Sequence, residues 1–243
     1  MTIFSIADLH LSDGDKPMDV FGANWTRHFE RICEDWRARA RGGDVVLLPG
    51  DLSWAMQLDA AAPHLRLLGD LPGRKVLLKG NHDYWWNAIG RVRRALPPNC
   101  YALQNDALLL DGVLYAGSRG WLLPGEGVSA EDERVYAREV LRLEMSLRTA
   151  RDLKPDAPLV GMMHYPPLTE KHPDTKFTRL FQAYGARHVV YGHLHGAALR
   201  HAVGGERGGV CYHQVSCDGL DFQLKEVARF PSPAPAEKSL NVK

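Results

Sequence analysis

The sequence predicts an α/β fold with α+β character, in which two mixed β-sheets pack together and helices flank them. Short apolar segments that end in Gly, Pro, Asp or Asn alternate with longer amphipathic segments, and this alternation is typical of sheets covered by helices. Two further stretches, 100–117 and 209–229, carry turn sequences between apolar runs. Antiparallel hairpins are therefore expected in both stretches.

Short segments rich in Val, Ile and Leu are predicted to form buried strands. They lie at 2–8, 44–51, 74–81, 157–164 and 187–193. Strands that are buried on both faces are usually parallel neighbours in a sheet. We therefore expect their carboxyl ends to gather at one edge, which is where α/β sheets bind ligands.

Amphipathic segments between these strands are predicted to form helices. The first helix follows Asn24, which is expected to be its N-cap, and the second covers about 54–69 after Ser53. A third helix is expected to run from Ser129 to about residue 151. Ser129 and Asp132 are spaced as in a capping box, which marks the beginning of a helix.

The chain of 243 residues is expected to fold as a single domain over residues 1–229. Within this domain, the region 118–178 contains segments long enough to form a cap and a loop over a site. The tail, 230–243, is rich in Pro, Ala and Ser and is expected to be disordered.

The composition indicates a soluble, cytoplasmic globular protein. Hydrophobic residues make up 45% and charged residues 24% of the chain, and the formal net charge is only +1, so a role in coating long nucleic acid is not expected. The first residues lack the pattern of a signal peptide, and no apolar run is long enough to cross a membrane. The four cysteines are scattered and form no C-x-x-C pair, which argues against a disulfide framework. Nothing in the sequence indicates an oligomeric state.

Polar side chains follow each of the predicted strands at its carboxyl end. They are two carboxylates, one amide and four imidazoles: Asp8, His10, Asp51, Asn81, His164, His193 and His195. This mixture suits Mn²⁺, Fe²⁺ or Zn²⁺ and contains too much nitrogen for Ca²⁺. Seven donors are too many for one ion but fit two, the arrangement used for phosphoryl displacement. We therefore expect two divalent ions, with Mn²⁺ as the preferred metal and Fe or Zn as alternatives.

The order of these motifs resembles that of the calcineurin-like metallophosphoesterases. The motifs are D-x-H at residue 8, G-D at residue 50, G-N-H-D at residue 80, a lone His164 and G-H-x-H at residue 192. The resemblance covers roughly residues 2–196, and "HYPP" and "GSRGW" are similar to a small bacterial subset of predicted phosphohydrolases. It implies a double-sheet sandwich with a dinuclear metal centre.

The resemblance also implies a role for each motif residue. The expected ligands of the first metal are Asp8, His10 and His195. Those of the second metal are Asn81, His164 and His193. Asp51 would bridge both ions, and a hydroxide activated by the two metals would be the nucleophile. His82 would be a general acid or charge stabiliser rather than a ligand, and Asp83 would bond the other nitrogen of the His82 ring.

Three further residues are candidates for substrate contacts. Arg119 begins the proposed cap segment and could bind phosphate as a bidentate fork. His172 lies in the loop between two expected ligands and could line the cleft. Trp85 could form a wall that stacks on a base or an aryl leaving group, or it could pack a helix against the sheet. The other histidines are interpreted as surface or core residues: His28, His64, His188, His201 and His213.

These observations predict a metal-dependent phosphohydrolase that acts on a small phosphomonoester or phosphodiester. One alternative is a nuclease on nucleic-acid ends, which the balanced charge weighs against. Another is a non-catalytic metal-binding scaffold. That alternative would be favoured by a missing ligand or a missing His82, and neither is missing.

Overall fold

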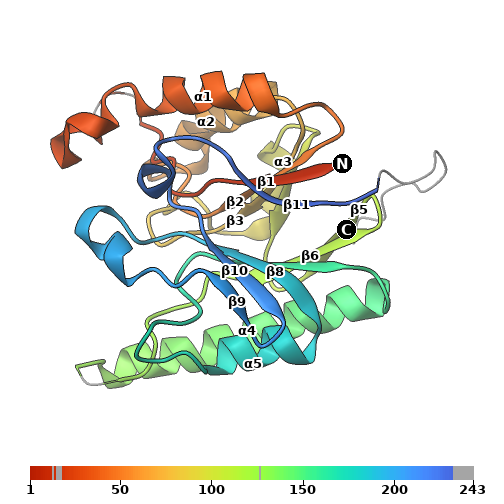
Figure 1. Cartoon of the computed structure of the whole chain (residues 1–243). Helices are drawn as coiled ribbons and strands as arrows, with labels where there is room; N and C mark the ends of the chain where they lie inside the picture. Colours follow the sequence, from red (N-terminus) through yellow and green to blue (C-terminus); the bar gives the residue numbers. More distant parts are fainter. Residues whose placement is uncertain (13, 15–17, 126, 232–243) are drawn as a thin grey trace.

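The computed structural model describes residues 1–12, 14, 18–125 and 127–231. Two β-sheets pack face to face, and helices cover the outer face of each sheet (Figure 1). This arrangement confirms the predicted α/β architecture of two mixed sheets flanked by helices. Most of the predicted tail, from residue 232 onward, lies outside the described residues.

The first sheet has five strands in the order β11-β1-β2-β3-β4. They are β11 (Lys225–Arg229), β1 (Thr2–Ser5), β2 (Val45–Pro49), β3 (Arg74–Leu78) and β4 (Cys100–Leu103). Strands β1 to β4 are parallel, and only β11 at the edge is antiparallel to its neighbour. The carboxyl ends of β1, β2 and β3 therefore meet at one edge.

The second sheet has six strands in the order β5-β6-β7-β8-β10-β9. They are β5 (Ala107–Leu110), β6 (Val113–Ser118), β7 (Leu159–Met163), β8 (Ala186–Tyr191), β10 (Val210–Gln214) and β9 (Gly205–Arg207). The four inner strands are parallel, and β5 and β9 are antiparallel edges. The five strands predicted as buried are β1, β2, β3, β7 and β8, and all five are present.

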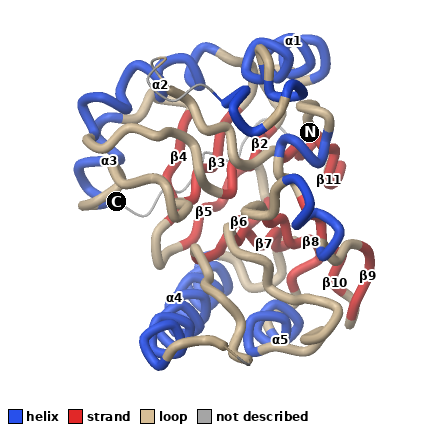
Figure 2. Tube along the Cα trace, turned by 90° about the vertical axis from the view of Figure 1, so that its left-hand side faces the viewer, coloured by secondary structure: helices blue, strands red, loops and turns tan. Residues whose placement is uncertain are grey.

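The helices form the outer layers, as Figure 2 shows. The first sheet is covered by α1 (His28–Arg39), α2 (Leu58–Asp70) and α3 (Ile89–Ala95), and the second by α4 (Ala130–Leu153) and α5 (Lys176–Ala183). Short 3-10 helices lie in the connections: η1 (Met18–Phe21), η2 (Ala23–Trp25), η3 (Gly196–His201) and η4 (Cys217–Leu220). None of the helices in the described part of the chain is long and apolar enough to span a membrane.

The helix caps were predicted with mixed success. Ser129 caps α4 as expected, because its side chain accepts the backbone N–H of Asp132. The first helix begins only at His28, after the 3-10 turn that contains Asn24, so Asn24 is not its N-cap. Ser53 is not a cap either, since α2 begins at Leu58. The Ser53 hydroxyl lies 2.8 Å from Nδ1 of His64 in α2 and is used for that contact.

The two predicted hairpin regions each pass between sheets. In 100–117, β5 and β6 form the expected hairpin, but β4 belongs to the first sheet and pairs in parallel with β3. In 209–229, β10 pairs with β8 and β9, whereas β11 crosses to pair with β1. Alternating apolar residues predict a strand but do not specify which sheet it joins.

The region 118–178 does not form a continuous cap. Helix α4 packs against β5, β6 and α5 on the outer face of the second sheet, and β7 is an inner strand of that sheet. Only the connections on either side of α4 and β7 remain available to approach a site. The buried face of α4 explains this placement, because residues such as Leu143, Leu147 and Ala150 are fully buried in the core beneath it.

Three apolar layers hold the sandwich together. One fills the space between the first sheet and α1–α3, with Trp36, Trp85 and Trp86 fully buried in it. A second lies between the two sheets, and a third lies between the second sheet and α4–α5. Both sheets are therefore buried on both faces, as their Val- and Leu-rich strands require.

Gly161 gives a test of the third layer. A Cβ added to Gly161 in β7 would lie 2.4 Å from Cε1 of Phe181 in α5. We expect Gly161→Ala to lower the free energy of unfolding by about 1–3 kcal/mol through overpacking. The measurement is urea unfolding, with Gly42→Ala as the control, since nothing lies within 4 Å of a Cβ at Gly42. Equal stability of the two variants would contradict tight packing of α5 on β7.

Candidate metal centre

The structure brings all seven expected ligands to the carboxyl ends of strands from both sheets. Asp8 and His10 follow β1, and their backbone N–H groups donate to the carbonyls of Gly50 and Asp51, which follow β2. In the second sheet, the N–H of Gly192 after β8 donates to the carbonyl of His164 after β7. The loops are thus tied to each other in pairs, which fixes the relative positions of the side chains they carry.

Four of the expected ligands have a left-handed backbone conformation. Their φ angles are 62° for Asp8, 46° for His10, 53° for Asp51 and 73° for His193. Non-glycine residues rarely adopt this conformation. Such strain persists where the surrounding structure enforces it, which is common at functional sites. Here it turns each chain sharply at the strand end, so that the side chain points into the shared space.

Two motif glycines allow the loops to approach closely. A Cβ at Gly80 would lie 2.1 Å from Oδ1 of Asp51, and a Cβ at Gly192 would lie 2.6 Å from Oδ2 of Asp8. Any side chain at these positions would therefore displace a carboxylate. The glycines of G-N-H-D and G-H-x-H make room for the acids of the neighbouring loop.

Asp8, His10 and His195 form one group of donor atoms, all within 4.8 Å of one another. Nδ1 of His195 lies 2.9 Å from Oδ1 of Asp218, so the ring's Nε2 is free for another partner. Oδ1 of Asp8 and Nε2 of His195 are buried and have no hydrogen-bond partner. Buried polar atoms are normally paired. A cation between these atoms would supply the missing partner, and Asp218 would orient the imidazole.

His164, Asn81 and His193 approach one another beside Asp51. Nδ1 of His164 is 3.0 Å from the carbonyl of Pro49, to which it donates, so its Nε2 carries a lone pair. This Nε2 lies 2.6 Å from Oδ1 of Asn81, which also lies 3.0 Å from Nδ1 of His193. Nε2 of His164 is also 3.5 Å from Oδ2 of Asp51. The lone pairs of these acceptor atoms repel one another at such short distances, and a cation between them would turn the repulsion into attraction.

Asp8, Asp51 and His164 form a second group within 4.8 Å, so Asp8 and Asp51 lie between the two sets of imidazoles. Burial raises the pKa of Asp8 to about 7, and burial also raises the pKa of Asp51. Burial lowers the pKa of His164 to about 3 and that of His193 to about 3. These imidazoles are thus neutral at pH 7 and need lose no proton to bind a metal.

His195 differs from the other imidazoles. Burial lowers its pKa, but the hydrogen bond to Asp218 and the charge of Asp8 outweigh that effect, so the pKa lies above the ordinary value. A proton must therefore leave His195 before its Nε2 can hold a metal. The donor set as a whole, with two buried carboxylates, one amide and four imidazoles, fits borderline divalent ions.

His82 lies beside this cluster without being held by Asp83. Its backbone N–H donates to Oδ1 of Asp51 over 2.8 Å, and its ring contacts the Trp54 ring at a centroid distance of 4.4 Å. Nδ1 of His82 is buried and has no hydrogen-bond partner. The expected bond from Asp83 to the His82 ring is therefore absent, and Trp54 is the neighbour that packs on the ring.

Asp83 instead joins two strand-end loops. Its fully buried carboxylate accepts the backbone N–H groups of Asp51, Leu52, Ser53 and Gly80, together with the indole N–H of Trp85. Burial and the nearby Asp51 carboxylate raise the pKa of Asp83, while the backbone hydrogen bonds act in the opposite direction. Asp83 is thus a positioning residue for the loop that carries Asp51.

Trp85 offers no surface to a substrate, because it is 0% exposed. The structure therefore supports the core-packing alternative for Trp85, and Trp86 is equally buried. Aromatic walls at the site come instead from Trp25 and Trp54. With Met18 and Phe21 they line a cavity of about 290 Å³ whose other walls include the expected ligands His10 and His195.

The two remaining substrate candidates lie in different clefts. Arg119 lines a cleft with Lys79 and Tyr84, and its guanidinium stacks on Trp121, 4.5 Å from the ring centroid. His172 is exposed and lines a cleft beside α5 that contains none of the expected metal ligands. The cleft of Arg119 contains none of the expected ligands either. The backbone carbonyl of Arg119 accepts the N–H groups of His164 and Tyr165, so its main chain lies beside the centre.

Sequence reasoning missed Asp218 and Trp54. Asp218 lies in "CDGLD", which reads as an ordinary turn, and its pairing with His195 depends on η4 returning to the G-H-x-H loop. Trp54 stacks on His10, with 4.8 Å between ring centroids and an angle of 20° between planes. Its only sequence signal is its position three residues after Asp51.

Comparisons with known proteins identify one family and two similar solved structures. The model of the calcineurin-like phosphoesterase family matches residues 1–197. Among solved structures, the chain is similar to phosphopantetheinyl hydrolase (PptH) from Mycobacterium tuberculosis, with 17% identity, a TM-score of 0.55 and coverage of 97% of this chain and 98% of that chain. A protein of unknown function from Aquifex aeolicus, AQ665, matches with 14% identity, a TM-score of 0.47 and coverage of 92% and 94%. No curated protein matches the sequence.

Metal binding is expected to strengthen as the pH rises. At about pH 5.5 Asp8, with a pKa of about 7, and His195, with a raised pKa, still hold protons that a metal must displace. Isothermal titration with Mn²⁺ should therefore show roughly tenfold or more tighter binding at about pH 8 than at about pH 5.5. Asp8→Asn should flatten this dependence. Equal affinity at both pH values in the native protein would show that neither group is a ligand.

Asp83→Asn should weaken both the fold and the metal site. The amide has one acceptor oxygen, so its NH₂ group must face backbone N–H donors that Asp83 now satisfies. We expect a loss of about 2–4 kcal/mol in the free energy of unfolding, together with weaker Mn²⁺ binding. Urea unfolding and titration calorimetry measure the two effects. Asp152→Asn, an exposed change in α4, is the control, and native-like behaviour of Asp83→Asn would contradict the positioning role.

Proposed function

Because the chain belongs to the calcineurin-like phosphoesterase family and is a metal-dependent phosphoesterase, we propose that it hydrolyses a small phosphoester at a dinuclear centre. The proposal is carried by one observation. The orphaned atoms Oδ1 of Asp8 and Nε2 of His195, with His10 beside them, lie in the same cluster as the converging Asn81 and His164. Asp51 lies between these two sets.

In this proposal, Asp8, His10 and His195 hold one ion, and Asn81, His164 and His193 hold the other. Asp51 contacts both. Bound divalent ions, for which we propose Mn²⁺, would polarise the phosphoryl group and lower the pKa of the attacking water. The chain itself contributes fixed geometry, since paired loops and left-handed backbone positions hold the donors before any ion arrives. Asp218 would orient the ring of His195, and the carbonyl of Pro49 would orient that of His164.

We assign His82 to the leaving group. Its ring lines the same cavity as His10, His195 and Trp54, and it does not belong to either group of donor atoms. A proton held on this ring can pass to the departing oxygen, or the ring can stabilise charge on the phosphoryl group. Trp54 packs on the ring and limits its rotation, which is the role that a hydrogen-bonded carboxylate would otherwise perform.

The apolar cavity suggests which esters fit. Trp25, Trp54, Met18 and Phe21 line it beside the reacting centre, and Phe21 is 66% exposed. An aromatic or aliphatic leaving group could bury its surface there while the phosphate stays at the ligands. A cavity of about 290 Å³ accommodates a small molecule rather than a nucleic-acid duplex. We therefore favour a small phosphomonoester or phosphodiester over a nucleic-acid end.

His82→Ala tests the assignment of the acid. We expect the variant to keep its metal content while kcat falls by roughly 100- to 10,000-fold. The assay uses an aryl phosphate and an aryl phosphodiester with Mn²⁺, Fe²⁺, Zn²⁺ or Mg²⁺, and metal content is measured by elemental analysis. His201→Ala, an exposed histidine at the end of η3, is the matched control. Loss of metal in His82→Ala would contradict a non-ligand role, and an absence of turnover by the native protein with every metal would contradict the proposed reaction.

A further inference from the structure

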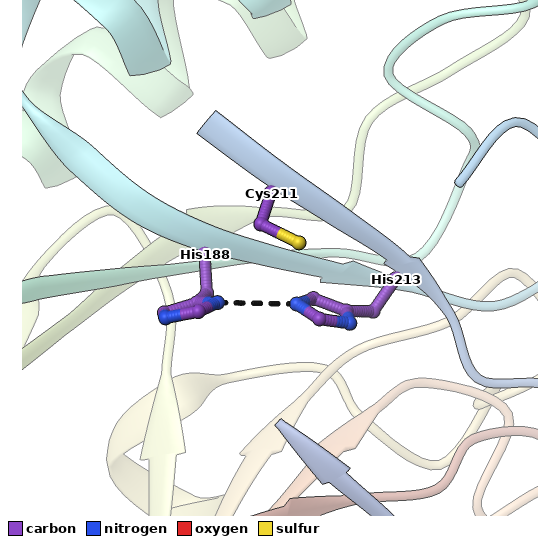
Figure 3. Close-up of side chains that lie close together, drawn as sticks. All are labelled: His188, Cys211 and His213. Atoms are coloured by element: carbon purple, nitrogen blue, oxygen red, sulfur yellow. Dashed lines mark hydrogen bonds between the residues drawn. The ribbon is translucent and has the colours of Figure 1, made fainter. Parts of the chain in front are cut away.

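A second set of metal-binding side chains lies on the second sheet, away from the centre described above. His188 comes from β8, and Cys211 and His213 come from β10. Their donor atoms lie within 4.8 Å of one another. Figure 3 shows the sulfur of Cys211 beside the line that joins the two imidazoles. His188 is three residues before the end of β8, which places it roughly 10 Å from the strand end that leads to His193.

The pairing of β8 with β10 explains why these side chains meet. Cys211 is the register partner of His188, and His213 follows two residues later on the same strand. Alternate residues of a strand point to the same face. The three side chains therefore share one face of two hydrogen-bonded neighbouring strands, and no loop movement is needed to assemble them.

We propose that His188, Cys211 and His213 bind one Zn²⁺ ion through the thiolate and one nitrogen of each ring. Around a tetrahedral zinc, donor atoms are separated by roughly 3.3–3.6 Å. Nδ1 of His188 and Nε2 of His213 are already 3.1 Å apart. His188 and Cys211 are partly buried, which leaves solvent access for water as the fourth ligand.

The charges around the cluster suit this ion. Burial lowers the pKa of His188 and lowers that of His213 to about 4, so both rings are neutral at pH 7. Lys225 of β11 lies close enough to act on His213 and would repel a cation, and a thiolate at Cys211 would offset this repulsion. Binding releases the thiol proton. One of the two rings donates an N–H to the other, and on binding this proton moves to the second nitrogen of its own ring. The thiol proton is therefore the one proton released for each ion bound.

The ion would connect strands that support the catalytic loops. Beyond His213, Val215 bonds through its N–H to Tyr191 at the end of β8 and through its carbonyl to Ala7. The chain then reaches Asp218, the partner of His195. A bond from β8 to β10 through zinc would stabilise this edge of the sheet, and a thiolate site of this kind contributes directly to folding stability.

Cobalt spectroscopy can detect this site specifically. The full-length protein is first saturated with Mn²⁺ and then titrated with Co²⁺, which replaces zinc and gives a near-ultraviolet band only when a thiolate binds it. The expected ligands of the catalytic centre include no cysteine, and the thiol of Cys217 is fully buried and donates to the backbone carbonyl of Asp8. We expect the absorption band to saturate at one Co²⁺ ion per chain and to disappear when excess Zn²⁺ is added.

Cys211→Ser should abolish the band, and Cys33→Ser, which changes a buried cysteine of α1, should retain it. A thermal melt provides a second measurement. Zn²⁺ added after Mn²⁺ should raise the Tm of the native protein and of Cys33→Ser by more than that of Cys211→Ser, because Zn²⁺ that displaces Mn²⁺ from the other centre affects all three proteins alike. The proposal is overturned if the native protein shows no band, if Cys211→Ser keeps it, or if Zn²⁺ shifts the Tm of both variants equally.

Discussion

The buried carboxylate of Asp83 is the interaction on which the geometry of the centre depends. It accepts hydrogen bonds from both the loop after β2 and the loop after β3. Those loops carry Asp51, Asn81 and His82, so one side chain fixes the proposed bridging residue, a proposed ligand and the proposed acid relative to one another. Its burial is unfavourable for a charge, and the surrounding N–H donors are the groups that make it tolerable. A carboxylate in this place acts on the metal only through the backbone it holds.

The same argument explains why the donor cluster requires cations. Asp8 and Asp51 are both buried, and burial raises the pKa of each. A protein that only needed stability would gain from replacing two buried acids with apolar residues. Their retention, with unpartnered imidazole nitrogens aimed at them, makes sense when divalent ions compensate the negative charge. Binding free energy then offsets strain stored in the left-handed positions of Asp8, His10, Asp51 and His193.

Much of the architecture, and the gathering of the seven expected ligands at one edge, follows from the sequence, because both depend on local patterns. Val- and Leu-rich runs predict β1, β2, β3, β7 and β8, and polar residues after parallel strands must share an edge. Other features depend on contacts between residues far apart in the chain. Asp218 reaches His195 only because η4 folds back. Strands β4 and β11 belong to the first sheet, but the pattern of apolar and polar residues in them does not indicate this. Asp83 is next to His82 in sequence, yet its neighbours in space are backbone amides.

Because Trp54 rather than Asp83 contacts the His82 ring, the proposed acid would be oriented by packing rather than by a hydrogen bond. A carboxylate would fix the ring through one directed bond, whereas the tilted contact with Trp54 limits ring rotation by packing alone. Trp54 donates its backbone N–H to the carbonyl of Leu11, and its ring stacks on His10. Both contacts fix its position. It also forms a wall of the cavity proposed for the leaving group. A leaving group packed on Trp54 would therefore complete the cage around His82, so that the acid is best oriented when substrate is bound. Binding and proton transfer would then be coupled through one indole ring.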